Sequence, residues 1–321
     1  MSKTLSSANK ANQPVSFPEL ATSPLQQLHS PLLEKTGVEL YVKRDDLIHP
    51  QFGGNKWRKL KYNLIQAREQ KYDTLLTFGG AWSNHIYATA AAAKHFSFNS
   101  IGMIRGEKHT PLNTTLAFAE RCGMQLHYVE RALYRQKHHP EYLKKIQQEF
   151  GDVYLLPEGG SNQLALKGCE EIVHEINDEI SKGFNIICCA SGTGATLAGL
   201  ARAITDRQLA IGFSALKGGN FLSDEVASFL NPSSGKKSNP PIKNWSIEQD
   251  FHFGGYAKID DELVSFMKQF QSQYGFELDA VYTGKMFYGL FHRIQSGHFK
   301  PGTVIVAVHS GGLQGNKGFN L

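Results

Sequence analysis

Short apolar runs alternate with helical stretches along most of this 321-residue chain, and small residues and glycines form many of the turns between them. This order is typical of strand–helix–strand crossovers, which produce a parallel sheet covered by helices on both faces. The sequence therefore predicts an α/β protein. The expected strands cover residues 38–42, 74–78, 101–104, 125–129, 185–190, 210–215, 280–282 and 304–308, with helices between them such as 112–122, 172–180, 263–274 and 285–295.

Four segments with possible chemistry follow expected strands directly. They begin after residues 78, 190, 282 and 308. In open α/β sheets, ligands bind in the crevice beyond the carboxyl ends of the strands. We therefore expect these four segments to meet at one ligand site.

The composition is that of a soluble globular protein, with 41% hydrophobic and 20% charged residues. The net charge is +5, but the basic residues are scattered, so no nucleic-acid partner is expected. The sequence has no apolar signal-peptide core, no apolar stretch of bilayer length and no zinc-finger spacing. We expect a cytoplasmic protein without a membrane partner or a metal. The four cysteines are few for this length, which indicates a reducing compartment. Cys188-Cys189 lies inside an apolar run, and both are expected to be buried thiols in a strand.

Two segments are expected to lie outside the packed core. The first two dozen residues are polar and should form a frayed N-terminus. Residues 231–244 (NPSSGKKSNPPIKN) lack periodicity and are rich in loop-forming residues. They predict a surface loop, with a lid over the site as the alternative.

The segment Gly53 to Leu60 places a lysine just after two glycines, at the expected start of a helix. Arg58 and Lys59 surround Lys56 with positive charge, which favours the neutral form of its amine. A neutral amine can attack a carbonyl, so Lys56 is a candidate Schiff-base lysine. A solvated, basic helix start would explain the same residues without any chemistry.

A second segment, Ser191 to Thr196 (SGTGAT), joins an apolar strand to a helix. Glycines let backbone N–H groups converge on an anion, and a helix N-terminus adds positive partial charge. This pattern predicts a phosphate cradle, and the alternative is a tight turn without a ligand. Leu197 stands where a dinucleotide fingerprint needs its third glycine, and no Walker lysine is present. A phosphate without a nucleotide is therefore favoured.

A Schiff-base lysine and a phosphate cradle together indicate pyridoxal 5'-phosphate, which also needs a partner for its pyridine nitrogen. From about residue 25 to the end, the chain resembles the 1-aminocyclopropane-1-carboxylate deaminase and D-cysteine desulfhydrase family. The motifs that carry this resemblance are Lys43-Arg44-Asp45-Asp46-Leu47, Gly53-Gly54-Asn55-Lys56, Arg58-Lys59-Leu60, Ser83-Asn84-His85, Gly159-Gly160-Ser161-Asn162, Tyr282-Thr283-Gly284-Lys285 and His309-Ser310-Gly311-Gly312.

The resemblance implies the tryptophan-synthase-β-like fold of fold type II pyridoxal-phosphate enzymes, with two parallel-sheet α/β domains. A large cofactor-binding domain would comprise residues 1–61 and 166–321. A smaller α/β domain, residues 62–165, would be inserted in it, with the active site between the two. The family also suggests a homodimer.

The resemblance also implies which residues bind the cofactor. Lys56 would hold it covalently and later move the substrate proton, while Lys59 would approach its phosphate. Asn84 would hydrogen-bond the phenolic oxygen, although it could simply belong to its turn. The phosphate cup would consist of Gly192, Thr193, Gly194, Ala195 and Thr196.

Three further residues are expected to face the substrate. Ser83 would act as a carboxylate ligand, an acid–base group or a nucleophile, and the alternative is a simple helix cap. Tyr282 would point its phenol at the reacting carbons, or it could be an ordinary strand tyrosine. His85 could be a general base, but a hydrogen-bond partner behind the site is the preferred interpretation.

Some positions depart from the family pattern. Deaminases of the family carry a glutamate, which pairs with the pyridine nitrogen, where this chain has Thr283. Desulfhydrase-like members have threonine there and a second hydroxyl near the C-terminus, so Ser310 is the predicted nitrogen partner. A hydroxyl gives a weaker electron sink than a carboxylate. β-Elimination tolerates this because the leaving group drains charge from Cα, whereas opening a cyclopropane ring has no such help.

Two aromatic residues leave the substrate open. Trp82 stands where relatives usually have glutamine, and it should make the pocket narrower and more apolar. Phe253 occupies what looks like a deaminase tyrosine position, so one phenol would be missing, and Tyr256 remains as a possible lining residue.

The predicted function is that of a pyridoxal-phosphate-dependent lyase or deaminase. The favoured reaction is α,β-elimination on a small amino acid such as D-cysteine, which would give pyruvate, ammonia and hydrogen sulfide. 1-Aminocyclopropane-1-carboxylate deaminase activity is one alternative. A protein that binds the cofactor or an amino acid without turnover is another, favoured by Trp82 and Phe253.

Overall fold

The structure is a computed structural model that describes residues 17, 20–231, 242–319 and 321. Most of the expected N-terminal segment and most of the 231–244 loop therefore lie outside the described residues. None of the helices within these ranges is long and apolar enough to cross a membrane.

The strands and helices follow one another as the alternating sequence pattern predicts. The strands are β1 (Leu25–Leu28), β2 (Glu39–Lys43), β3 (Thr74–Gly80), β4 (Asn99–Arg105), β5 (Met124–Val129), β6 (Tyr154–Leu156), β7 (Ile186–Ser191), β8 (Leu209–Ser214), β9 (Trp245–Glu248) and β10 (Val304–Val308). The α-helices are α1 (Pro31–Thr36), α2 (Asn55–Glu69), α3 (Asn84–His95), α4 (Thr114–Arg121), α5 (Arg131–Tyr134), α6 (Pro140–Phe150), α7 (Gln163–Glu179), α8 (Ala195–Ala203), α9 (Phe221–Leu230), α10 (Asp261–Tyr274) and α11 (Thr283–Gln295). Short 3-10 turns are η1 (Asp45–Leu47), η2 (Glu158–Gly160) and η3 (Leu313–Phe319).

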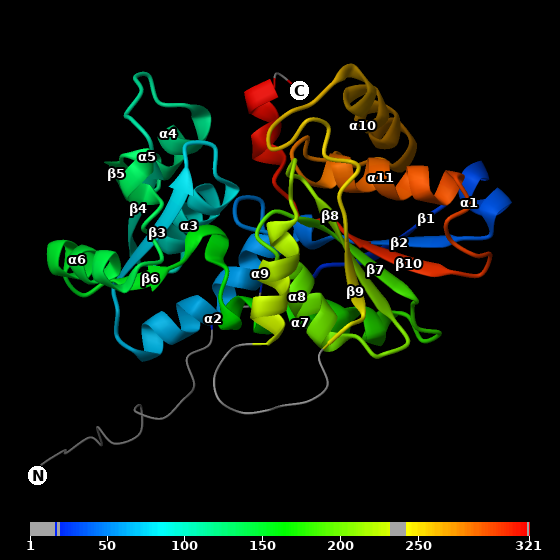
Figure 1. Cartoon of the computed structure of the whole chain (residues 1–321), viewed down its shortest axis with the longest axis horizontal. Coiled ribbons are helices and arrows are strands. Elements are labelled where there is room, and N and C mark those ends of the chain that lie inside the picture. Colours follow the sequence, from blue (N-terminus) through cyan, green and yellow to red (C-terminus); the bar gives the residue numbers. More distant parts are fainter. Residues whose placement is uncertain (1–16, 18–19, 232–241, 320) are drawn as a thin grey trace, which may run out of the picture.

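The strands form two sheets. The larger has the order β1-β2-β10-β7-β8-β9, and all its neighbours are parallel except β1 and β2. The smaller has the order β5-β4-β3-β6 and is entirely parallel. Figure 1 shows the smaller sheet and its helices on the left and the larger sheet on the right. The predicted α/β class with two parallel-sheet units is confirmed, and among these strands only the edge strand β1 is antiparallel.

Helices cover both faces of the larger sheet, so alternate residues of its central strands are buried on opposite sides. In β7, Cys188 packs with α10 and α11 in one core, and Cys189 packs with α7 and α8 in the other. Successive residues of a strand point to opposite faces, so a strand covered on both sides must be apolar throughout. The expected burial of these two thiols in a strand is therefore confirmed, and both are free cysteines.

The sequence-based prediction lacks β1, β6 and β9 and includes one strand that does not form. β1, β6 and β9 are edge strands of only three or four residues, too short for a clear periodic pattern. The strand expected at residues 280–282 is wrong. The Asp279 carboxylate accepts hydrogen bonds from the N–H groups of Val281, Tyr282 and Thr283 at 2.8–3.0 Å. These residues consequently form the turn that begins α11.

Helices α2 and α7 connect the two sheets. The smaller sheet comprises strands from residues 74–156, and the larger one comprises strands before and after that range. The expected domain boundaries at 61/62 and 165/166 fall inside α2 and α7, so no linker separates the two units at those points. The close packing of α2 on α7 requires glycine at position 168. A Cβ there would lie 1.8 Å from the Arg58 carbonyl oxygen of α2.

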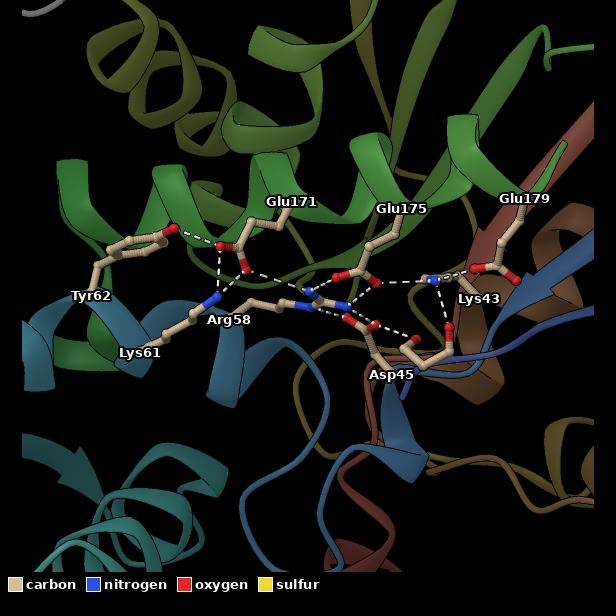
Figure 2. A network of polar contacts seen from close by, with 9 residues as sticks. Lys43, Asp45, Arg58, Lys61, Tyr62, Glu171, Glu175 and Glu179 are labelled. Carbon is tan, nitrogen blue, oxygen red and sulfur yellow. Dashed lines mark hydrogen bonds and ion pairs between the residues drawn. The ribbon is translucent and has the colours of Figure 1, made fainter. Parts of the chain in front are cut away.

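A row of charged side chains holds α2 against α7 (Figure 2). The Arg58 guanidinium donates to both oxygens of Asp45 at 2.8 and 3.1 Å, and these two side chains are 4% and 0% exposed. Arg58 also donates to Glu175 on α7 at 2.8 Å, and Lys43 on β2 pairs with Glu175 at 3.0 Å. We call Lys43, Asp45, Arg58 and Glu175 the ion cluster. Figure 2 shows the α7 glutamates in a row along these cations.

Removing Arg58 should destabilise the fold more than removing the half-exposed Lys61. Arg58→Met leaves the fully buried Asp45 carboxylate without its guanidinium, which we expect to lower the free energy of unfolding by about 3–5 kcal/mol. Lys61→Met removes a half-exposed ion pair with Glu171 on the same helix and should cost about 0–1 kcal/mol. Urea denaturation of both variants measures the difference, and equal losses would contradict the assigned role of the buried pair.

Candidate active site

In the segment after residue 282, residues 283–285 do not line the site. The other three segments meet, together with Tyr282, at one cavity. Its volume is about 870 Å³, and its lining comes from elements of both sheets. The site residues predicted from the sequence that line it are Lys56, Lys59, Trp82, Ser83, Asn84, His85, Gly192, Thr193, Gly194, Thr196, Tyr256, Tyr282 and Ser310. Two predicted residues, Ala195 and Phe253, are not part of the lining.

Lys56 lies in the first turn of α2, where Gly53 and Gly54 allow the chain to approach the C-terminal segment. Gly54 has φ +70°, and a Cβ on it would lie 2.0 Å from the Ser310 carbonyl oxygen, so only glycine fits. Burial, followed by the nearby Lys59 charge, lowers the pKa of Lys56 to about 7. A large fraction of this amine is therefore neutral near pH 7, as a nucleophilic lysine requires.

Lys59 lies one turn further along α2 and is directed at the glycine loop. Its Nζ donates to Thr193 Oγ1 at 3.1 Å, to Ser161 Oγ at 3.3 Å and to the Gly159 carbonyl at 3.4 Å. Thr193 and Ser161 are themselves hydrogen-bonded at 2.8 Å. Neutral oxygens hold this ammonium in place, so its positive charge remains to attract an anion at the loop.

The segment from Ser191 to Thr196 has the features of an anion cradle. It joins β7 to α8, and Gly194 at φ +78° occupies the N-cap position without a side-chain cap. The first N–H groups of α8 therefore have no side-chain cap, and Gly194 and Thr196 beside them line the cavity. The Ser191 hydroxyl is buried and has no hydrogen-bond partner among the described residues. An orphaned donor, an uncapped helix start and Lys59 together suit a phosphate, so the residues present fit pyridoxal phosphate.

Two glycine-loop residues have further structural roles. A Cβ on Gly192 would lie 3.0 Å from the ring of Tyr282, so glycine lets the phenol approach the loop. Thr196 Oγ1 accepts a hydrogen bond from Asn55 Nδ2 at 3.1 Å. This hydrogen bond links the start of α2 to the start of α8, and both residues line the cavity.

Ser83 is both a helix cap and a cavity residue. Its Oγ accepts from the N–H groups of His85 and Ile86 at 3.2 and 3.3 Å, which caps α3. Its own hydroxyl proton can still be donated into the cavity, which Ser83 lines. Asn84 begins α3, and its Oδ1 accepts from Gln314 Nε2 at 2.9 Å. The capping alternative therefore holds for Ser83 without excluding contact with a substrate.

His85 is held behind the site as a neutral ring. Thr77 Oγ1 donates to the Leu156 carbonyl at 3.0 Å, so it accepts from His85 Nε2 at 2.8 Å. The ring is buried, and burial together with the Lys56 and Lys59 charges depresses its pKa well below the usual range. The geometry favours the interpretation of His85 as a hydrogen-bond partner and not as a general base.

Two phenols, not one, line the cavity. The rings of Tyr256 and Tyr282 lie 6.1 Å apart in a T-shaped arrangement. The expectation that Phe253 lines the substrate site is wrong, because its ring packs edge-to-face on Tyr288, 4.8 Å away, in the core beneath α11. Trp82 lies at the mouth of the cavity with 48% of its surface exposed.

The C-terminal segment contributes Ser310, whereas Thr283 turns away. The Thr283 hydroxyl donates to Asp279 Oδ2 at 2.8 Å and accepts from the Asp279 N–H at 2.8 Å, and Thr283 is not part of the cavity lining. Asp279 is a residue that the sequence analysis misses. An acidic residue shortly before a helix is a capping signal that could have found it.

The smaller sheet adds charged lining residues that the sequence analysis also misses. Arg105 is the last residue of β4, and Lys137 pairs with Glu158 at 3.2 Å. All three line the cavity. The rule that ligands bind beyond strand ends would have indicated Arg105, but no local motif marks the other two.

Comparison with known proteins agrees with this geometry. A family described as pyridoxal-phosphate dependent enzyme matches residues 17–311. A Pyrococcus furiosus protein, provisionally named a 1-aminocyclopropane-1-carboxylate deaminase, is 32% identical over 302 residues, which are 91% of this chain and 90% of the relative. A D-cysteine desulfhydrase from Salmonella choleraesuis is 29% identical over 92% of this chain and 94% of its own.

A solved structure supports the same assignment. The crystal structure of an ACC (1-aminocyclopropane-1-carboxylate) deaminase homologue matches with a TM-score of 0.76 and 28% sequence identity, over 95% of both chains. This likeness confirms the fold type II architecture expected from the sequence, and the family match over residues 17–311 includes every strand of both sheets. The chain therefore belongs to the ACC deaminase and D-cysteine desulfhydrase family of pyridoxal-phosphate-dependent enzymes.

Proposed function

We propose that this protein catalyses α,β-elimination on a small amino acid and that D-cysteine is the preferred type of substrate. The products would be pyruvate, ammonia and hydrogen sulfide. The observation that carries the proposal is the pairing of two lysines on one helix face. Lys56 has its pKa lowered to about 7, and Lys59 is held against the glycine loop.

The residues of this chain would hold the cofactor at both ends. Lys56 would bind it covalently, while Lys59, the N–H groups at the start of α8 and the orphaned Ser191 hydroxyl would bind its phosphate. When bound, the cofactor supplies an electron-withdrawing ring that stabilises negative charge at Cα. The amine of Lys56 is then suited to remove and return the Cα proton, because its pKa lies close to neutral pH.

The other cavity residues would orient the substrate. Ser83 can donate its hydroxyl proton to the substrate carboxylate at the start of α3, where the helix dipole also favours an anion. Burial raises the pKa of Tyr282 well above its ordinary value, so its phenol stays protonated. It can therefore donate a hydrogen bond to the departing sulfur.

The preference for elimination over ring opening rests on Ser310. It lines the cavity, whereas Thr283 is directed to Asp279. A hydroxyl beside the pyridine nitrogen would favour a weak electron sink, which is sufficient where a leaving group accepts the electrons. The thiol of D-cysteine is such a group, because its sulfur leaves as hydrosulfide when the Cβ–S bond breaks.

Two other functions remain as alternatives. Deaminase activity on 1-aminocyclopropane-1-carboxylate is supported by the name of the Pyrococcus furiosus relative. Binding without turnover is less favoured, because Tyr256 supplies the phenol that Phe253 lacks. We also infer a homodimer, as the family suggests, and keep the domain division at residues 61/62 and 165/166 as part of this proposal.

The substrate preference can be measured directly. We expect the purified holoenzyme to release pyruvate and sulfide from D-cysteine and to release little 2-oxobutanoate from 1-aminocyclopropane-1-carboxylate. L-Cysteine is the matched control for chirality. Ring opening without pyruvate formation would reverse the order of the two activities. A cofactor spectrum that responds to no amino acid, D or L, would instead support binding without turnover.

The lowered pKa of Lys56 predicts an unusual pH dependence of its reactivity. Only the neutral amine reacts in reductive methylation, so Lys56 of the cofactor-free protein should reach half of its maximal rate near pH 7. The lysine of a short reference peptide added to the same reaction should do so only near pH 10, about three units higher. Peptide mass spectrometry across this pH range compares the two residues. Identical profiles would contradict the proposed electrostatics.

A further inference from the structure

Lys285 is a buried cation that the proposed chemistry does not use. It lies in the first turn of α11, three residues after Tyr282, and only 1% of its surface is exposed. Its Nζ donates to the carbonyl oxygens of His252 and Gly255 at 2.9 and 2.7 Å. Both acceptors belong to the loop that follows β9 and carries Tyr256.

This loop has a backbone that needs support. Phe253 and Ala257 have φ values of +51° and +53°, which are unfavourable for residues with a side chain. Such conformations persist where the surrounding structure holds them in place. The hydrogen bonds from Lys285 reach His252, just before Phe253, and Gly255, between Phe253 and Ala257.

The hydrogen bond to Gly255 acts next to the cavity. The Gly255 carbonyl belongs to the peptide bond that leads into Tyr256, whose ring lies 6.1 Å from that of Tyr282. Tyr256 itself is 43% exposed, so packing restrains it only in part. Tyr282 and Lys285 both lie at the start of α11. By binding the Gly255 carbonyl, Lys285 therefore holds the loop residue Tyr256 near Tyr282.

A cation at this position calls for a reason beyond packing. Burial lowers the pKa of Lys285 to about 8, although the Asp279 and Asp260 carboxylates nearby favour its charge. An apolar side chain of similar length would fill the same space without this desolvation cost. Its two carbonyl acceptors on the loop explain why the residue is a lysine.

We propose that Lys285 is a positioning residue, which holds the 252–257 loop so that Tyr256 stays against Tyr282 in the cavity. The kinetic part of this proposal rests on the proposed function. The structural part does not, because it concerns only the geometry of the loop. Lys285 is expected to act through Tyr256, without touching the substrate itself.

Hydrogen–deuterium exchange tests the structural part. In Lys285→Met, the amides of residues 252–258 should exchange about tenfold faster or more, while those of α10 and the rest of α11 keep their rates. Lys268→Met, on the exposed face of α10, is the matched control and should leave exchange in the loop unchanged. If Lys285→Met does not fold, Lys285→Gln replaces it, because the glutamine amide keeps an N–H donor group at this position.

A double-mutant cycle on the holoenzyme tests the kinetic part. With D-cysteine, Lys285→Met should lower kcat/KM about 10-fold to 100-fold because Tyr256 is misplaced. In the Tyr256→Phe background the same change should lower it by about threefold at most, since the phenol is already absent. Unchanged exchange in the loop, or kinetic effects that simply multiply, would overturn the proposal. If D-cysteine is not turned over at all, the proposed function fails and the exchange result alone decides on Lys285.

Discussion

The buried pair of Arg58 and Asp45 is the interaction on which the arrangement of the site depends. Asp45 follows β2 in the larger sheet, and Arg58 lies in α2, the helix that leads to the smaller sheet. Glu175 extends the ion cluster to α7. The buried Arg58–Asp45 pair fixes direction as well as distance, because an unpaired charge in the same place would be costly. The first turn of α2 is thereby held with Lys56 facing the cavity.

The same helix presents cations to two opposite environments. On one side the carboxylates of Asp45 and Glu175 raise the pKa of Arg58 and so stabilise its charged form. On the other side Lys56 and Lys59 lie close together among neutral oxygens, and burial lowers the pKa of both. The difference explains why one turn of helix can anchor the fold and also offer a reactive amine. The glycines at residues 53 and 54 make this possible, because they let the turn pack against the backbone of Ser310.

Local pattern predicts the parts of this protein that depend on local chemistry. Apolar strands, the glycine loop before α8 and the lysine at the start of α2 are all recognisable in the sequence. Residues whose roles depend on distant partners are not. The strand expected at 280–282 fails because the Asp279 carboxylate captures its N–H groups, and Phe253 turns to Tyr288 where a cavity position is expected. The role of Lys285 likewise depends on its hydrogen bonds to the distant carbonyls of residues 252 and 255.

The central claim is that Lys56 is the covalent attachment point of the cofactor. Borohydride reduction of the holoenzyme, followed by peptide mapping, tests it most directly. We expect the pyridoxyl group on the peptide that contains Lys56, and we expect Lys56→Ala to lose both this adduct and the visible cofactor band. A pyridoxyl group on Lys59, Lys285 or another lysine, or a band that survives Lys56→Ala, would contradict the account.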